Sequence, residues 1–161
     1  MTTLSELPDE QLLRLDHQIC FSLHAAARAF NGVYRLALRD LDLTYPQYLA
    51  MLVLWEDGDQ PVKQIGERLR LDSGTLSPLL KRLEMAGLVR RERSAEDERS
   101  VTVRLTEAGT ALRGRALEVP RRISRATGLD VADITELRAL LERVTTALDA
   151  AVADGATLTG A

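Results

Sequence analysis

The sequence predicts a mainly α-helical fold with one small β-hairpin. Most apolar residues recur at spacings of three and four, which is the period of an amphipathic helix. One stretch near residue 100 alternates between apolar and other residues, as a strand does. The 161 residues can form one sizeable core, and a hydrophobic content of 45% with 28% charged residues is typical of a soluble globular protein.

The composition argues against a secretory signal, a membrane span, a disulfide and a metal site. The acidic start lacks the basic and apolar regions of a secretory signal, and the longest apolar run, Leu49 to Trp55, is too short to span a membrane. The single cysteine, Cys20, cannot form an intrachain disulfide, and with only two histidines a metal site is not expected. We therefore expect a cytoplasmic protein with no membrane partner, no metal and no cofactor.

The first predicted element is a long helix from about Pro8 to Arg39, which contains Cys20. Its apolar stripe consists of Leu12, Leu15, Ile19, Leu23, Ala26, Phe30, Val33 and Ala37. A second helix is predicted to follow as far as about Glu56, with Thr44 as its N-cap and Pro46 in its first turn. A lone helical cysteine is most often a small buried hydrophobic residue, and that interpretation of Cys20 stays open at this point.

Two short helices follow the turn "DGDQ". They cover "VKQIGERLR" and "SGTLSPLLKRLEMAG", are joined by "LD", and each has one apolar face. This pattern is typical of a helix-turn-helix. Asp72 or Ser73 can cap the second of them, Gly87 can end it, and Pro78 is expected to bend it.

The outward side of that second helix suits a DNA major groove. Small hydroxyl side chains near its start can reach base edges, and two cations further on can reach phosphates. The residues concerned are Ser73, Thr75, Ser77, Lys81 and Arg82. An ordinary amphipathic helix has a polar exterior too, so this helix alone does not decide between the two interpretations.

The next segment, "LVRRERSAEDERSVTVRLT", predicts a β-hairpin with a polar tip. Val101, Val103 and Leu105 alternate along one strand. The arginines around the hairpin are Arg90, Arg91, Arg93, Arg99 and Arg104. Residues 61–105 carry ten Lys or Arg against seven Asp or Glu, a net +3, which leaves −6 for the rest of the chain. A helix-turn-helix followed by a basic hairpin predicts a winged helix that binds double-stranded DNA, with an arginine at the wing tip in the minor groove.

The last two predicted helices are expected to take part in dimerisation. One runs from about Glu107 to Arg125 and is expected to bend at Pro120. The next has the stripe of a helix–helix seam, formed by Ile134, Leu137, Leu141, Val144, Leu148 and Ala151. We therefore expect a single domain over residues 1–161, with the winged helix-turn-helix at 61–105 and dimerisation helices at 8–40 and 106–153.

Three separated blocks of the sequence carry a family resemblance. The "DERS" motif, Asp97 to Ser100, resembles the D-x-R-S signature of MarR-family transcription regulators, and the order of helices fits that family along nearly the whole chain. The blocks "LDHQICFSLHAAAR", "LTYPQYLAMLVLWE" and "LDSGTLSPLLKRLE" are similar to the OhrR branch, whose members repress genes for organic-hydroperoxide resistance.

The resemblance implies roles for individual residues in sensing peroxide and in binding DNA through the wing. Cys20 would be the cysteine that organic hydroperoxides oxidise, with Tyr34 and Tyr45 as hydrogen-bond donors to its sulfur. Asp97 would brace the wing, and Arg99 would reach the minor groove. With no second cysteine the chain resembles the one-cysteine type, so oxidised Cys20 must react next with a low-molecular-weight thiol or a backbone nitrogen.

Helix geometry makes a prediction about assembly. Cys20 and Tyr34 are fourteen residues apart, which is about 21 Å along one helix at 1.5 Å per residue. They cannot touch within one subunit, so a sensor that uses both must be a homodimer. Its DNA target is then expected to be a pseudo-palindromic operator.

Two other functions stay open. The first is a MarR-type regulator that responds to a small aromatic ligand and in which Cys20 is structural. The second is a one-cysteine thiol peroxidase, against which stand the absence of the strand–helix alternation of thioredoxin-like folds and the unexplained DNA-binding module. We expect a repressor and not an enzyme.

Overall fold

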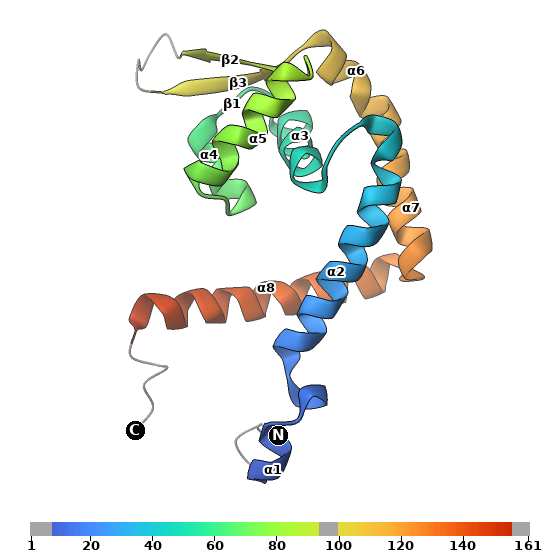
Figure 1. The fold of residues 1–161 in the computed structure, drawn as a ribbon, viewed down its shortest axis with the longest axis vertical. Helices are drawn as coiled ribbons and strands as arrows, with labels where there is room; N and C mark the ends of the chain where they lie inside the picture. The colour runs from blue at the N-terminus through green and yellow to red at the C-terminus, as the bar shows by residue number, and fades with distance from the viewer. Residues whose placement is uncertain (1–7, 94–99, 156–161) are drawn as a thin grey trace. The chain divides into compact units, whose positions relative to one another are not determined.

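The predicted fold class is confirmed by the computed structural model, which describes residues 8–93 and 100–155. Helices dominate, and a three-stranded antiparallel sheet forms the wing (Figure 1). The chain divides into two compact units, Met1–Pro120 and Arg121–Ala161, which we describe separately. Among the described residues no helix is both long enough and apolar enough to cross a membrane.

The single long helix predicted from Pro8 to Arg39 is wrong. The structure has a short helix α1 (Asp9–Leu12), a 3-10 turn η2 (Leu15–His17) and the helix α2 (Ile19–Ala37). Between them the Gln18 side chain donates to the carbonyls of Leu12 at 2.6 Å and Arg14 at 3.2 Å. Such local bonds from side chain to backbone compete with helix formation. As a result, α2 starts at Ile19, and Cys20 lies in its first turn.

The start of the next helix is confirmed as predicted. A 3-10 turn η3 (Arg39–Leu41) leads into α3 (Tyr45–Asp57), with Thr44 as the N-cap and Pro46 in the first turn. The Thr44 N–H donates to Oε1 of Gln47 at 2.8 Å, which completes a capping box. These bonds fix the point at which the chain enters α3, and thereby the position of Tyr45.

The helix-turn-helix is also confirmed. It consists of α4 (Val62–Leu69) and α5 (Ser73–Met85), and Asp72 caps α5 by accepting the Thr75 N–H at 2.9 Å. The helix α5 continues through Pro78. Its inner side packs into the core through four buried leucines: Leu76, Leu79, Leu80 and Leu83.

The wing has the two predicted strands and one that the pattern did not predict. Strands β2 (Val89–Arg93) and β3 (Val101–Leu105) pair antiparallel, with Arg91 opposite Val103. A two-residue strand β1 (Gln60–Pro61) pairs with the other side of β3, so the order is β1-β3-β2. Two residues are too few to show alternation, which is why the sequence does not reveal β1.

The sequence predicts one helix from Glu107 to Arg125 with a bend at Pro120, whereas the structure has two helices in this range. These are α6 (Glu107–Ala116) and α7 (Glu118–Thr127), separated at Leu117. Pro120 has no N–H to offer the carbonyl of Ala116, and its ring crowds that carbonyl, so the helix is interrupted there. The last helix, α8 (Val131–Asp154), begins with an Asp130 capping box.

One close contact ties α6 to the core of the first unit. The Trp55 indole N–H donates to the Gly109 carbonyl at 2.9 Å. A Cβ on Gly109 would lie 2.0 Å from the backbone oxygen of Leu88, so this position requires glycine. The start of α6 is therefore packed directly against the loop that precedes the wing.

Candidate DNA-binding face and thiol sensor

The outward side of α5 presents the five residues predicted to contact DNA. Ser73, Thr75, Ser77, Lys81 and Arg82 are all exposed. The Thr75 hydroxyl donates to the Asp72 carboxylate at 3.0 Å, so Thr75 also serves the helix cap. The hydrogen bonds from the backbone and side chain of Thr75 hold the pKa of Asp72 below its ordinary value, against a smaller opposing effect of burial. The cap is therefore charged at neutral pH.

Arg91, also predicted to contact DNA, is bound to a carboxylate. Glu84 accepts hydrogen bonds from the Arg91 side chain, from Nε at 2.9 Å and from Nη2 at 2.7 Å. These side-chain bonds have the largest effect on the pKa of Glu84, and the bond from the Arg91 backbone N–H has the next largest. Together they hold this pKa below its usual value. The residue pattern did not indicate this pair, because the two residues lie on different elements.

Other arginines of the wing region are paired as well. Arg104 contacts Asp59 at 3.2 Å and Glu92 at 3.1 Å, and Arg90 contacts Glu92 at 2.9 Å. Exposed pairs of this kind contribute little to stability, but they reduce the positive charge that the surface offers to DNA. A count of basic residues in the sequence therefore overstates the attraction of the wing strands for phosphate.

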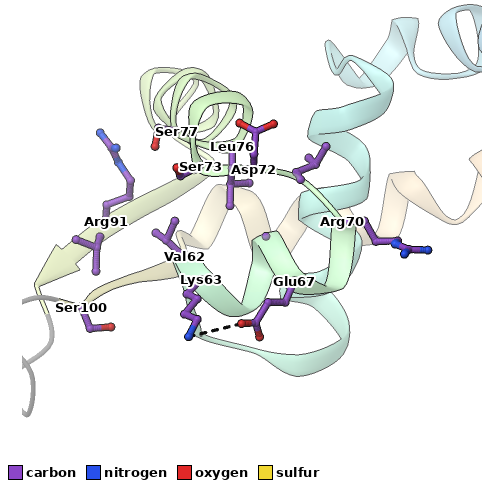
Figure 2. A pocket seen from close by; sticks show the side chains of 13 residues that line it. Val62, Lys63, Glu67, Arg70, Asp72, Ser73, Leu76, Ser77, Arg91 and Ser100 are labelled. Atoms are coloured by element: carbon purple, nitrogen blue, oxygen red, sulfur yellow. Dashed lines mark ion pairs between the residues drawn. The ribbon is translucent and has the colours of Figure 1, made fainter. Parts of the chain in front are cut away.

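A groove of about 920 Å³ lies between α4, the first turns of α5 and the wing. Figure 2 shows Ser73 and Ser77 on α5 and Lys63 on α4, with Arg91 on the strand side. Hydroxyl groups and cations of this kind bind phosphate oxygens in protein–DNA complexes. The tip of the wing, with the predicted residues Asp97 and Arg99, lies outside the described residues, so their roles stay predictions.

Cys20 lies at a helix end that is open to an anion. It is exposed and sits in the first turn of α2, where Gln18 provides no side-chain cap. Neither the Ile19 nor the Cys20 N–H has an acceptor within the part of the chain that the structure describes. Unpaired N–H groups and the helix dipole favour negative charge at this end. The sequence did not indicate this environment, since the periodicity continues through residues 13–18.

Tyr34 and Tyr45 are brought together, as their proposed common role requires. Their ring centroids are 4.4 Å apart, and Tyr48 lies 6.1 Å from Tyr34. Burial, followed by the neighbouring phenols, raises the pKa of Tyr34 to about 12, and burial raises that of Tyr45. Both phenols are therefore protonated at neutral pH and can donate hydrogen bonds.

The same chain does not bring its own Cys20 to this pair. Cys20 and Tyr34 lie on one continuous helix, α2, separated by about 21 Å along its axis. Every residue of α2 from Ile19 to Asn31 is exposed in the single chain. The predicted apolar stripe is present there, with Ile19 61% and Phe30 36% exposed.

Comparison with known proteins identifies the family. Residues 33–113 match the family described as "Transcriptional regulator SarA/Rot". The chain is 46% identical over 129 residues to the organic hydroperoxide resistance transcriptional regulator of Bacillus subtilis, covering 80% of this chain and 88% of that protein. It is 50% identical over 135 residues to the HTH-type transcriptional regulator TtmR of Methylorubrum extorquens, covering 84% and 68%.

Solved structures agree with these relatives. Overoxidized AbfR bound to DNA matches with a TM-score of 0.74 and 34% identity over 88% of this chain and 98% of that one. The same TM-score and identity are found for reduced AbfR bound to DNA. The chain belongs to the MarR-type and SarA/Rot family of winged-helix DNA-binding transcription regulators, in the branch of the organic hydroperoxide resistance regulators.

Proposed function

We propose that the protein is a redox-sensing repressor that releases its operator when organic hydroperoxide oxidises Cys20. The observation that carries this proposal is the position of Cys20, exposed in the uncapped first turn of α2. A thiolate, rather than a thiol, attacks peroxides, and the exposed Cys20 sulfur is open to the oxidant. The similarity to the organic hydroperoxide resistance regulator supports the choice of oxidant.

The chemistry needs only the peroxide and then a nucleophile. The Cys20 thiolate attacks one peroxide oxygen, an S–O bond forms and the O–O bond breaks. Sulfur loses two electrons to the peroxide, and the departing alkoxide takes up a proton to leave as an alcohol. The sulfenic acid then condenses with a low-molecular-weight thiol or a backbone nitrogen, which releases water. In the proposed function this oxidation is a signal that changes DNA binding, so the protein acts as a regulator and not as a peroxidase.

The sensor is completed by a second subunit. In the homodimer that we propose, Tyr34 and Tyr45 of one subunit donate hydrogen bonds to the Cys20 sulfur of the other. The exposed apolar stripe of α2, and the exposed Leu137, Leu141 and Leu148 of α8, support dimerisation. Oxidation removes the bonds to the thiolate and adds bulk, which would change the distance between the two copies of α5.

DNA recognition is assigned to α5 and the wing. The side chains of Ser73, Ser77 and Lys81 lie one turn apart along α5 and suit the major groove, with Thr75 and Arg82 at its flank. Arg99 at the wing tip would enter the minor groove, braced by Asp97. Two subunits related by a two-fold axis would present two copies of α5 and the wing, which fits a pseudo-palindromic operator. The protein would act in the cytoplasm.

The test uses Cys20→Ser and a duplex that the reduced wild-type protein selects from a random-sequence library. Serine keeps a small polar side chain but cannot form a sulfenic acid. We expect Cys20→Ser to bind the duplex within a few fold of wild type and to keep it when cumene hydroperoxide is added, whereas wild type releases it. Peroxide-driven release by Cys20→Ser would contradict the proposal.

One observation favours a second candidate function, a response to a small aromatic ligand. A cavity of about 330 Å³ lies between α3 and α6, lined by residues including Tyr48, Trp55 and Arg113. Aromatic rings and a guanidinium suit an aromatic carboxylate. Quenching of the fluorescence of Trp55, the single tryptophan, by benzoate would support this function if benzoate also released DNA from Cys20→Ser.

A further inference from the structure

A carboxylate at the end of α5 holds an arginine at the centre of the wing. Glu84 lies in the last turn of α5, and Arg91 is the middle residue of β2. Besides the two guanidinium bonds, Glu84 accepts the Arg91 backbone N–H at 3.0 Å. Its two oxygens thus bind both the side chain and the strand itself. The contact fixes where β2 lies against α5, as well as where the guanidinium points.

This arginine lines the groove between α5 and the wing. Ser73, Ser77, Lys63 and Ser100 line the same groove and offer hydroxyl groups and a second cation (Figure 2). The carboxylates on its wall are already engaged, because Glu67 lies 3.8 Å from Lys63 and Asp72 caps α5. Lys63 is engaged by the same pair, so what the groove offers a ligand is mainly hydroxyl donors and the part of the Arg91 guanidinium that Glu84 does not bind.

The shape of duplex DNA identifies what fits this groove. A single phosphodiester strand separates the major groove from the neighbouring minor groove. With α5 in the major groove and the wing tip in the minor groove, as in the proposed function, that strand must pass between α5 and the wing. The groove lies between these two elements and is lined by groups that bind phosphate oxygens.

We propose that this groove seats the phosphodiester strand between the two DNA grooves, and that Glu84 is a positioning residue that holds Arg91 there. The inference rests on the proposed binding of α5 and the wing to DNA. Nε and Nη2 of Arg91 are turned to Glu84, which leaves Nη1 without a partner among the described residues and able to bind a phosphate.

We expect Glu84 to increase the preference for one DNA sequence, and not the overall affinity for DNA, because its own charge is negative. A carboxylate beside a phosphate site weakens attraction to every duplex, whatever its sequence. Lys81 and Arg82 on α5 are exposed and have no ion-pair partner among the described residues, so they supply attraction without it. Glu84 instead restricts Arg91 to one position, which favours the duplex whose bases and backbone fit together.

The experiment compares Glu84→Gln with Glu67→Gln, an identical charge change on the wall of the same groove. Fluorescence anisotropy measures affinity for the duplex selected by wild type and for a scrambled duplex of equal composition, over a series of salt concentrations. For Glu84→Gln we expect weaker binding of the selected duplex and unchanged or tighter binding of the scrambled one. The ratio of the two affinities should fall on the order of tenfold. For Glu67→Gln both affinities should rise together and the ratio should stay the same.

A second variant guards against a folding defect. Arg91→Lys keeps the charge but cannot make the two-pronged contact, so the affinity ratio should fall with an unchanged melting temperature. An unchanged ratio in both Glu84→Gln and Arg91→Lys would overturn the proposal, and so would equal losses on both duplexes that follow a loss of stability. If wild type itself selected no sequence, the proposed DNA recognition would fail first, and the role of Glu84 with it.

Discussion

The rings of Tyr34 and Tyr45 lie against each other at a centroid distance of 4.4 Å and a tilt of 40°. Tyr34 is close to the end of α2, and Tyr45 is the first residue of α3. The pair therefore joins two helices at the connection between them. Because both phenols stay protonated at neutral pH, the pair can offer two hydrogen-bond donors from neighbouring rings.

The raised tyrosine pKa predicts a loss of stability in alkali. A tyrosine in the unfolded chain has a pKa of about 10, whereas burial raises the pKa of Tyr34 in the folded protein to about 12. Above pH 10 the unfolded chain loses this proton first, so the free energy of unfolding should fall as pH rises from about 10 to 12. Urea unfolding over this range measures the effect, and Tyr34→Phe should make the fall shallower. An equal slope in both proteins would contradict the raised pKa.

Mixed dimers test whether the sensor is shared between subunits. One subunit carries Cys20→Ser and the other carries Tyr34→Phe. The remaining thiol then faces an intact Tyr34 from its partner, so it should react with cumene hydroperoxide at close to the wild-type rate. The Tyr34→Phe homodimer should react more slowly, because it has lost a hydrogen bond to a charged sulfur, worth about 1.5 to 3 kcal/mol. A mixed dimer as slow as that homodimer would place the tyrosine and the thiol in one subunit.

Dimerisation should depend on the apolar side of α2. Leu23 is 39% exposed in the single chain and belongs to the predicted stripe, so Leu23→Glu would bury a charge in the interface. We expect it to shift the protein to monomers in sedimentation at low micromolar concentration and to abolish tight operator binding. Arg28→Glu, on the opposite side of α2, is the control and should remain dimeric. A Leu23→Glu monomer that still bound the operator tightly would rule out an obligatory dimer.

Arg99 should contribute to DNA affinity without supporting the fold. Arg99→Ala should weaken operator binding and reduce the salt slope by roughly one, as expected for one lost phosphate or minor-groove contact. Arg143→Ala, an exposed arginine of α8 outside the predicted seam, should leave both quantities unchanged. Dimerisation and melting temperature should be equal in both variants. Full affinity in Arg99→Ala would remove this residue from the mechanism.

Two glycines of α6 should respond oppositely to the same substitution. Gly109→Ala forces a Cβ to within 2.0 Å of the Leu88 carbonyl and should destabilise the protein by about 1 to 3 kcal/mol, as overpacking does. Gly114→Ala meets nothing within 4 Å and should stabilise α6 by about 0.5 to 1 kcal/mol. Denaturant unfolding of the two variants measures both changes. Equal effects would mean that α6 does not pack closely on Leu88.

Local patterns in the sequence were enough to predict the helix-turn-helix, because the leucine spacing, the Asp72 cap and the short joint all act within a few residues. The same holds for Thr44 and Pro46 at the start of α3. The break before Cys20 was not predictable, since the apolar period continues through it and the Gln18 bonds that cause it are visible only in three dimensions. The Glu84–Arg91 contact depends likewise on how β2 turns back onto α5.

For the proposed sensor residues, too, the sequence was sufficient for one relationship and not for another. Counting residues along the helix was sufficient to separate Cys20 from Tyr34 within one chain. It was not sufficient to place Tyr34 beside Tyr45, because that contact depends on the direction in which η3 and the Thr44 cap lead the chain into α3.

If Cys20 is the residue that peroxide oxidises, as proposed, its position at a helix end has a consequence for how the oxidation is reversed. Helices open first at their ends, and the bonds nearest to Cys20 are those from the Phe21 and Ser22 N–H groups to the Gln18 carbonyl, at 3.0 and 3.3 Å. A bulky adduct on the sulfur can be accommodated by fraying this turn, while the later turns of α2 keep Tyr34 in place. In the proposed sensor, reduction would have only one turn to rewind, and we expect a protein reset by a thiol to respond to a second pulse of peroxide.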